Sequence, residues 1–565
     1  MTFSTAPISA KGPRGPLVWD IVAALLVLLL LVFLAEAGRG LLQPLPKGPS
    51  ISLSPWSLPH YAARTTLRML TALACSLLFT LTYATAAAKS PRAAVILVPL
   101  LDILQSVPIL GFISISVVFF LSLTPGRMMG AELAAVFAIF TSQAWNMAFS
   151  FYQSLRTVPV ELTEVSYAFR LGPWMRFWRL EVPFAMPALV WNMMMSMSGG
   201  WFFVVASESL SVGPTSVSLP GVGSYIALAI AQRDLTAIGW AVAAMLAVIL
   251  ICDQLLFRPL VAWSDRFRLE QQSEAATPSS WVLTTLRRSR LVAMGTQPLG
   301  RLWATTYQIM PKPAQAMPAT GPPRAAPLGI AAVLLIALAL WRSGLASLHP
   351  ADVVEPLLLG LITMLRVFLL IGVASLIWVP VGVWLGLRPR AARIAEPVAQ
   401  FLAAFPANIL FPLAVSGIVA FRLNPDVWLS PLMVLGTQWY ILFNVIAGAS
   451  TIPSEMRDTA ASLHVRGWLW WRKVALPAVF PFYMTGALTA SGGSWNASIV
   501  AELATWGDVT LRAHGLGSYI ADATAAGDFR RILLGVVVMS LFVVVLNRSF
   551  WRPLAALAER KFRLT

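Results

Sequence analysis

The chain contains two copies of one pattern, and this repeat restricts its architecture more than any other feature of the sequence. The stretch Gly221-Val-Gly-Ser-Tyr-Ile-Ala227 recurs as Gly515-Leu-Gly-Ser-Tyr-Ile-Ala521, 294 positions later. Further residues match at the same offset: Pro159 and Pro453, Glu161 and Glu455, Trp174 and Trp468, Pro183 and Pro477, Trp201 and Trp495, Glu208 and Glu502. Nearer the start of each half the offset is 298, as for Arg68 and Arg366, so a short insertion separates the copies. The sequence therefore predicts two related halves with the same fold.

Apolar runs long enough to cross a bilayer, about 20 residues each, occur six times in each half. They lie near 18–36, 62–88, 93–121, 131–153, 184–206 and 236–256, and again near 326–343, 357–386, 396–421, 429–447, 478–500 and 531–548. The chain is 58% hydrophobic and only 12% charged, a composition typical of membrane proteins. We therefore expect an all-α membrane protein with about 12 transmembrane helices. Because six spans return the chain to its starting side, the two six-helix repeats run parallel rather than inverted.

Two of these runs are interrupted by helix-breaking residues. Pro108 and Gly111 fall within the third run, and Pro406 and Pro412 fall within the ninth. Proline removes a backbone hydrogen bond and disfavours a helical residue before it. The third and ninth spans are therefore expected to be the least regular.

Three parts are predicted along the chain: a first half at 1–258, a linker at 259–325 and a second half at 326–565. Basic residues gather in short segments between apolar runs, as at Lys89 and Arg92, which is typical of cytoplasmic loops. The net charge of +17 is therefore attributed to topology and not to nucleic-acid binding. Both termini and the linker are expected on the cytoplasmic side. The linker's 281–308 portion is expected to lie on lipid headgroups, with a regulatory role as the alternative.

The sequence offers no catalytic or metal-binding pattern. The four histidines are scattered singly, and Cys75 and Cys252 both lie in apolar runs. The phosphate-binding pattern GxxxxGK[ST] does not occur in the sequence. No catalytic residue, metal site or cofactor is therefore predicted for this chain. If ATP drives the protein, ATP and Mg²⁺ must bind to a separate subunit.

A polar, helix-prone segment lies between the fourth and fifth apolar runs of each half, at 154–183 and at 448–477. In each, a proline suits the start of a helix, and acidic residues follow where the helix dipole favours them. Small residues then form a stripe that a partner could approach closely. Docking onto another protein is the preferred interpretation, and an interfacial helix that only supports the spans is the alternative. The residues assigned to docking are Glu161, Glu164, Ala168, Arg170, Gly172, Glu455, Asp458, Ala460, Ser462, His464 and Gly467.

Both segments resemble the cytoplasmic coupling loop of ABC-type importer permeases. That loop has an acidic residue near its start, a glycine further on and a terminal Leu-Pro, which Leu476-Pro477 and, with valine for leucine, Val182-Pro183 match. The resemblance departs at the family's glycine, six residues after the acidic position, where Arg170 and His464 stand. The turn inside each loop is therefore expected to be displaced toward Gly172 or Gly467.

Other motifs are similar to the nitrate/sulfonate/taurine/bicarbonate-type branch of these permeases. The segments 99–108 and 397–406 resemble its third-span signature, and 201–208 and 495–502 resemble its fifth span, with Trp followed by Glu. The resemblance covers most of both halves and implies a type I importer permease in the bacterial inner membrane. It further implies two copies of a cytoplasmic ATPase that bind ATP and Mg²⁺, one under each coupling loop. An extracytoplasmic binding protein would deliver a small oxyanion such as nitrate, sulfonate or bicarbonate.

Two other classes of protein compete with this interpretation. A secondary transporter or channel would leave the two matching cytoplasmic helices unexplained. A membrane-embedded enzyme is disfavoured because the acidic residues pair across the repeat and do not converge on one site.

Polar residues within the predicted spans are candidates for the translocation path. Glu208 lies 25 residues after Pro183, which places it near the outer boundary at about 1.5 Å per residue. Arg68 and Arg366 open the second span of each half and are candidate partners of Glu208 and Glu502. The sequence leaves open whether these pairs form a gate or a structural ion pair. Trp201 and Trp495, on the same helix face as the glutamates, are further candidates. The remaining candidates, each equally compatible with a helix–helix hydrogen bond, are Asn192, Asn496, Gln143, Asn146, Gln438 and Asn444.

Overall fold

A computed structural model describes most of both halves. The described residues are 20–22, 24–25, 51–267 except 107, 126, 213 and 214, then 280–289, a few positions from 292 to 300, and 350–562. The span expected at 326–343, most of the span expected at 18–36, and most of the linker lie outside these residues.

The first half folds into long helices joined by short ones. Its elements are η1 (Pro55–Ser57), α2 (Leu58–Lys89), α3 (Pro91–Ser106), α4 (Ile109–Leu123), α5 (Met128–Arg156), α6 (Val160–Ala168), α7 (Pro173–Arg176), η2 (Phe177–Glu181), α8 (Val182–Glu208), β1 (Ser209–Val212), β2 (Thr215–Ser218), α9 (Val222–Ala231), α10 (Leu235–Cys252), η3 (Asp253–Phe257), α11 (Arg258–Ser264) and η4 (Asp265–Phe267). Helix α12 (Trp281–Arg288) follows in the linker.

The second half repeats this order. Its elements are α15 (Pro350–Gly386), α16 (Pro389–Ala404), η6 (Ala407–Ile409), α17 (Phe411–Ala420), α18 (Pro425–Trp428), α19 (Leu432–Leu435), α20 (Gln438–Ser450), α21 (Ser454–Ser462), α22 (Gly467–Trp470), η7 (Trp471–Ala475), α23 (Leu476–Ala501), β3 (Leu503–Trp506), β4 (Val509–Arg512), α24 (Leu516–Ala526), α25 (Phe529–Leu546), η8 (Asn547–Trp551) and α26 (Arg552–Phe562).

Seven helices in the described part of the chain are long and apolar enough to cross a membrane. An eighth crossing is a pair of segments, Pro425–Leu435 and Gln438–Ser450, bent by 45°. The expected third and ninth spans are broken where the prolines fall, because α4 begins after Pro108 and η6 begins after Pro406. The prediction of a helical membrane protein built from two repeats is confirmed.

Each half also contains a short β-hairpin that the sequence did not predict. The strands of each hairpin are antiparallel, with Ser209 opposite Ser218 and Leu503 opposite Arg512. Gly507 turns the second hairpin with a positive φ of 59°, a conformation that glycine adopts without steric cost. Each hairpin follows a fifth-span helix directly, so it lies at the C-terminal end of that helix.

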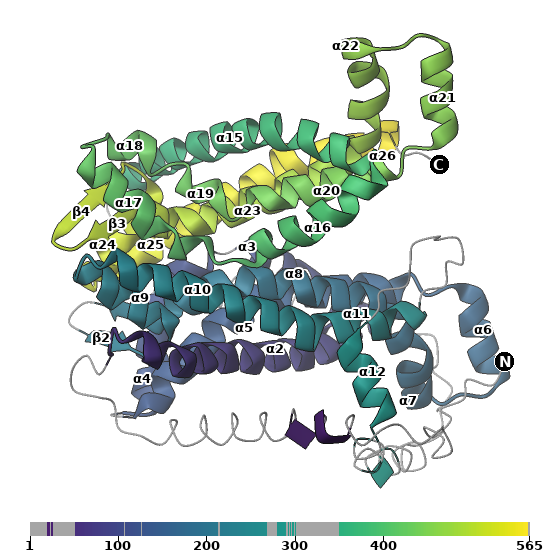
Figure 1. Cartoon of the computed structure of the whole chain (residues 1–565), viewed down its shortest axis with the longest axis horizontal. Coiled ribbons are helices and arrows are strands. Elements are labelled where there is room, and N and C mark those ends of the chain that lie inside the picture. Colours follow the sequence, from purple (N-terminus) through teal and green to yellow (C-terminus); the bar gives the residue numbers. More distant parts are fainter. Residues whose placement is uncertain are drawn as a thin grey trace.

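The two halves lie side by side along a common long axis (Figure 1). Helices α6, α7, α21 and α22 lie at one end, which we call the coupling end, and the hairpins with α9 and α24 lie at the other, the hairpin end. The C-terminal helix α26 lies at the coupling end. One cluster of buried hydrophobic residues runs through both halves. Alanines on one face of α5, such as Ala134 and Ala138, are fully buried and allow its neighbours to pack closely.

Candidate functional site

The predicted coupling loops have the same structure in both halves. Helices α6 and α21 each begin after a proline, carry a glutamate in the first turn (Glu161 and Glu455) and end after nine residues. A short helix and a π-helical turn then lead each loop into α8 or α23. Both α6 and α21 stand away from the body of the protein (Figure 1). The repeat seen in the sequence is therefore also a repeat of conformation.

The turn that ends each loop helix lies at Arg170 and His464, so the expectation of a displaced turn is wrong for the helix ends. In the second half, Gly467 at the start of α22 also has a positive φ of 58°. Arg170 has φ of 50° and His464 has φ of 55°, both in the left-handed region. The next residue closes the helix end in both halves. The Leu171 amide donates to the Ser166 carbonyl (3.0 Å), and the Val465 amide donates to the Ala460 carbonyl (2.9 Å). This is the hydrogen-bonding pattern of a Schellman helix end. A non-glycine residue in the left-handed conformation is destabilising by about 1–2 kcal/mol. The hydrogen bonds that fix the helix end at this position offset that strain.

These two residues give a stability prediction. Arg170→Gly and His464→Gly are each expected to stabilise the protein by about 1 kcal/mol, because glycine adopts positive φ without steric strain. The measurement is the midpoint of thermal unfolding of the purified chain in detergent. Arg457→Gly, in the right-handed interior of α21, is the matched control and should destabilise by about 1 kcal/mol. A lower midpoint for both turn variants would contradict the strain argument.

The small residues of the loops fall on two different faces. Ser166 and Ala460 occupy equivalent positions and are buried, with Ala460 packed against Ile452 and Val474. Ala168 and Ser462, two positions later, are exposed. The buried pair therefore seats each loop helix on the body, and the exposed pair lies on a free face. Of the other residues assigned to docking, Gly172 is half-buried. The rest are exposed at the surface of the loops: Glu161, Glu164, Arg170, Glu455, Asp458, His464 and Gly467.

Large apolar side chains are exposed on the same loops. Phe169 and Trp468 are each 73% exposed, and Leu463 is 70% exposed. Apolar side chains exposed beyond the ends of the spans and rimmed by charges are typical of protein–protein contact sites. The loops thus present an apolar and acidic surface at the coupling end.

At the hairpin end of the first half, Glu208 lies in a fully buried cluster. Its carboxylate accepts hydrogen bonds from Arg68 Nη1 (2.7 Å), Thr65 Oγ1 (2.6 Å) and the amide of Gly223 (2.7 Å). The other side of the guanidinium donates to Glu132, with Nη2 at 2.7 Å. We call Thr65, Arg68, Glu132 and Glu208 the first acidic cluster. The expected pairing of Glu208 with Arg68 is present, and Glu132 forms a second ion pair with the same arginine.

The second half builds an equivalent cluster. Glu502 accepts from Thr363 Oγ1 (2.9 Å), Arg366 Nη1 (3.3 Å) and the amide of Gly517 (2.7 Å). Arg366 Nη2 donates to Asp426 (2.8 Å), which occupies the repeat position of Glu132. We call Thr363, Arg366, Asp426 and Glu502 the second acidic cluster. The expected pairing of Glu502 with Arg366 is therefore present too.

The two clusters differ in their exposure to solvent. The Glu132 side chain is 11% exposed, whereas that of Asp426 is 35% exposed. Asp426 also contacts the ring of His514 (3.0 Å), which is itself mostly exposed. The second cluster is therefore the better hydrated of the two.

A cavity of about 680 Å³ lies between the two halves. Helices α5 and α8 line it from the first half, and α20, α23 and η8 line it from the second. Its polar lining includes Gln105, Ser142, Asn146, Thr437, Tyr440, Thr489, Asn496, Asn547 and Arg552. No carboxylate is found among the described residues of the lining, and Arg552 supplies a positive charge. The cavity therefore presents hydrogen-bond donors and acceptors from both halves.

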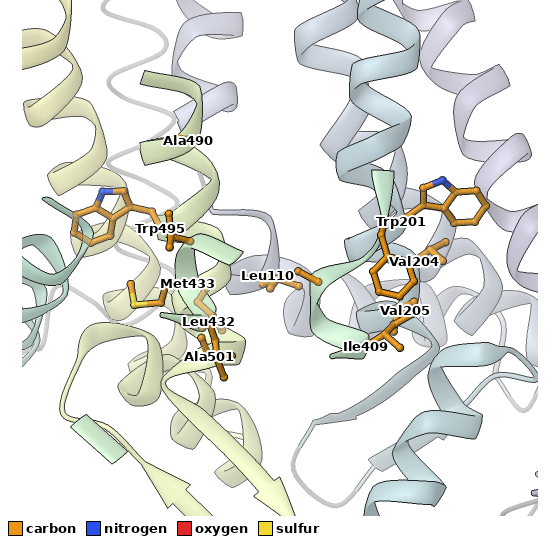
Figure 2. Packing of buried hydrophobic residues seen from close by; sticks show 14 of the residues in the cluster. Leu110, Trp201, Val204, Val205, Ile409, Leu432, Met433, Ala490, Trp495 and Ala501 are labelled. Atoms are coloured by element: carbon orange, nitrogen blue, oxygen red, sulfur yellow. The ribbon is translucent and has the colours of Figure 1, made fainter. Parts of the chain in front are cut away.

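Three of the predicted path residues line this cavity, namely Asn146, Asn496 and Trp495. Asn146 accepts a hydrogen bond from Gln105 Nε2 (2.8 Å), which lies on a different helix of the same half. The rings of Trp495 and Trp201 point away from each other, each into its own half, with Leu110 between them (Figure 2). Both tryptophans are almost fully buried. They therefore pack within the halves, although Trp495 reaches the cavity with part of its surface.

The remaining predicted path residues make contacts within one half. Gln143 is buried beside Met69, and Gln438 accepts from the indole of Trp378 (2.8 Å). Asn192 donates to Ser150 Oγ (2.8 Å), and Asn444 donates to the Tyr440 carbonyl (2.8 Å). Glu208 and Glu502 are not among the lining residues. The four amide side chains thus make contacts within or between helices of one half, as in the alternative that the sequence left open for them.

Sequence reasoning missed Glu132, Asp426, Gln105 and Tyr440. A signal existed for the two acids, because Glu132 and Asp426 match at the 294-residue offset that relates Glu208 to Glu502. No such signal existed for Gln105, whereas Tyr440 stands at the repeat position of a predicted path residue. Their repeat partners are Ala403 and Asn146, so the polar lining differs between the halves.

One protein family and several curated proteins match the chain. The family, described as "Binding-protein-dependent transport system inner membrane component", matches twice, over residues 76–266 and 378–561. A relative is the bicarbonate transport system permease protein CmpB of Synechococcus elongatus, 30% identical over 31% of this chain. The nitrate import permease protein NrtB of Leptolyngbya laminosa is 26% identical over 31% of this chain. The osmoprotectant import permease protein OsmY of Salmonella typhimurium is 28% identical over 39% of this chain.

The extent of these matches differs among the relatives. The matched stretch spans 60% of the length of CmpB, 59% of NrtB and 88% of OsmY. Each relative matches about a third of this chain, and the family matches once in each half. The two copies of the family domain correspond to the two structural repeats.

Proposed function

Because the chain belongs to the family of binding-protein-dependent transport system inner membrane components, we propose that it is the transmembrane component of an ATP-driven importer, with both halves of the pathway in one polypeptide. The observation that carries this proposal is the pair of coupling loops. They share a helix start, a left-handed turn and an exposed apolar surface. Two similar docking surfaces at one end of the molecule fit two copies of one cytoplasmic ATPase, which bind ATP and Mg²⁺.

The solute crosses through the cavity between the halves by alternating access. ATP binding draws the two ATPases together, and the loops transmit this movement to α8 and α23, which follow them directly. A solute delivered at the hairpin end by an extracytoplasmic binding protein would then reach the cavity. A channel or secondary transporter would have no use for paired docking surfaces.

A docking experiment tests the coupling surface. Ala168→Trp combined with Ser462→Trp should leave the chain folded but prevent association with the ATPase, because a bulky side chain on the free face blocks close approach. Co-purification of the ATPase from membranes measures this, and association should fall by about tenfold or more, a loss of about 1.4 kcal/mol. Thr510→Trp, on the exposed hairpin at the opposite end, is the matched control and should bind the ATPase normally. Normal co-purification of the double variant would refute this docking surface.

The proposed solute is a small oxyanion such as nitrate, bicarbonate or a sulfonate. The absence of carboxylates among the described lining residues and the presence of Arg552 favour an anion over a cation. The names of CmpB and NrtB agree with this choice, whereas OsmY is described as an osmoprotectant permease. A largely uncharged polar lining also suits a zwitterion, so an osmoprotectant is the second candidate.

Uptake into proteoliposomes that contain the whole complex distinguishes these solutes. Nitrate, bicarbonate, an alkyl sulfonate and glycine betaine would be supplied singly with the binding protein, and ATP would be enclosed with the ATPase. ATP-dependent uptake of an oxyanion is expected. Uptake of glycine betaine alone would favour the second candidate, and uptake that persists without ATP would favour a secondary transporter.

A further inference from the structure

In each half, the break in the proline-interrupted span contacts the long fifth-span helix of the other half, which is α23 for the first half and α8 for the second. The amide of Ile109, directly after Pro108, donates to Asn496 Oδ1 on α23 at 2.7 Å. In the opposite direction, Asn408 Nδ2, two residues after Pro406, donates to the carbonyl of Phe202 on α8 at 3.1 Å. Both hydrogen bonds join one half to the other.

The two contacts are related by the repeat. Phe202 and Asn496 are equivalent positions on α8 and α23, at the offset of 294. Pro108 and Pro406 are equivalent at the offset of 298. Each proline break therefore meets the same point on the opposite helix, once through a backbone amide and once through a side-chain amide. A reciprocal contact of this kind is a property of the interface between the halves and not of either half.

Apolar side chains close the space around these hydrogen bonds. Leu110 lies between the two long helices, and Ile409 lies beside Val205 of the other half (Figure 2). Leu110 is 6% exposed and Ile409 is fully buried. The rings of Phe202 and Phe411 meet edge to face across the halves, with centroids 6.5 Å apart. The contacts around the two hydrogen bonds are thus largely apolar.

The two proline breaks and their contacts on α8 and α23 form one layer, which bounds the central cavity on the side of the hairpins. Pro108, Ile109 and Asn496 belong to the cavity lining, and on α23 the lining ends at Ala497. In the other direction the lining continues to Asn547 and Arg552, near the coupling end. The cavity lining therefore ends, on the side of the hairpins, at the two proline breaks.

We infer that Asn408 and Asn496 latch this layer as the gate on the hairpin side of the cavity. The gate opens when their two hydrogen bonds break together with the contacts that join the halves beyond the layer, from the Gly507 amide to the Ile230 carbonyl (3.0 Å) and from Arg233 to Asp508 (3.2 Å). The inference rests on the proposed transport function, since only a transported solute requires the layer to open. The break in each span makes the contact separable. The Ile109 amide lies in the first turn of α4, where no partner exists within the helix, and water satisfies it after opening.

The strength of the latch follows from the number of its bonds. A net hydrogen bond between protein groups changes an equilibrium by about fivefold. Loss of both bonds therefore raises the open-to-closed ratio about 25-fold. This is enough to shift the resting population without unfolding the helices, because the apolar packing within each half is unaffected.

Accessibility of a cysteine in the cavity tests the latch without the ATPase. Thr489 lines the cavity on the coupling side of Asn496 and is exposed or half-buried there. Thr489→Cys would be placed in a chain that also carries Cys75→Ser and Cys252→Ala. A membrane-impermeant maleimide, added from the hairpin side of sealed vesicles, should label it slowly. Adding Asn408→Ala and Asn496→Ala should raise the labelling rate about 25-fold, and Asn496→Ala alone about fivefold.

Two asparagines whose bonds stay within one half serve as matched controls. Asn192→Ala and Asn444→Ala remove the hydrogen bonds to Ser150 and to the Tyr440 carbonyl and should leave the labelling rate unchanged. An unchanged rate in the double latch variant, or an equal increase in the controls, would overturn the inference. If the double variant does not fold, the two single variants test the latch instead, each with an expected increase of about fivefold. Because labelling needs no ATP, a positive result with no ATP-dependent uptake would refute the proposed function and leave the latch standing.

Discussion

Replacing Arg68 by methionine is expected to destabilise the protein by about 3–5 kcal/mol. The guanidinium contacts both Glu132 and Glu208 and is almost fully buried with them. Methionine fills a similar volume but leaves two carboxylates in the protein interior without a positive charge. Breaking a buried ion pair by removing one partner is costly because the other remains uncompensated. The measurement is the yield of monodisperse protein in detergent and its midpoint of thermal unfolding.

Arg366→Met is the matched control in the other half. Removing Arg366 leaves only Glu502 buried without a positive charge. The other acidic partner, Asp426, is one-third exposed and also faces His514, so water and the imidazole stabilise that carboxylate. A smaller loss, about 1–3 kcal/mol, is therefore expected. Equal losses in the two halves would show that hydration of the second acidic cluster has no part in its stability.

A neutralised variant separates charge from packing. Combining Arg68→Met with Glu132→Gln and Glu208→Gln removes every formal charge of the first acidic cluster. Most of the stability lost by Arg68→Met should return, because a buried ion network replaced as a whole is often energetically neutral. No recovery would indicate that Arg68 acts through shape and hydrogen bonding and not through its charge.

The sequence could predict the helical repeats because their cause is local and periodic. A run of about 20 apolar residues has few folded states other than a transmembrane helix, and a second copy at a fixed offset must fold in the same way. The prolines at 108 and 406 likewise act on their own backbone, so the breaks in the third and ninth runs could be predicted from the sequence. The pairing of Glu208 with Arg68 could be predicted since a charge within a span needs a partner.

The turns at Arg170 and His464 show where local reasoning fails. Glycine is the usual residue for positive φ, so a turn without glycine was expected to move along the chain to Gly172 or Gly467. The hydrogen bonds to Ser166 and Ala460 decide the position instead, and both of these residues are buried against the body. Tertiary contacts thus outweigh the intrinsic preference of one residue.

The cavity and the proline-break contacts could not be predicted for a different reason. They join residues that lie hundreds of positions apart, as with Ile109 and Asn496. The repeat does not indicate them either, because Asn496 is matched by Phe202 and the two contacts use different chemical groups. Sequence identified asparagines within the spans but could not separate Asn496, which bridges the halves, from Asn444, which bonds within its own helix.

The second large effect is expected at the glycines that face the buried glutamates. Gly221→Ala and Gly515→Ala should each destabilise the protein by about 3 kcal/mol. A Cβ at Gly221 would overlap the carboxylate of Glu208, and one at Gly515 would overlap that of Glu502. Neither carboxylate can move aside, because each is held by an arginine, a threonine and the amides at the start of the following helix. The readout is the midpoint of thermal unfolding in detergent.

A glycine with open space around it supplies the control for these two variants. Gly239→Ala, in α10 with no neighbour near the added methyl group, should be neutral or slightly stabilising, because alanine favours a helix by up to about 1 kcal/mol over glycine. The double variant at Gly221 and Gly515 should lose the sum of the two single effects, since the acidic clusters belong to different halves and share no residue. If Gly221→Ala unfolds at the same temperature as Gly239→Ala, the Glu208 carboxylate has room to move. The first acidic cluster would then be a mobile group of charges and not a fixed anchor for the hairpin end.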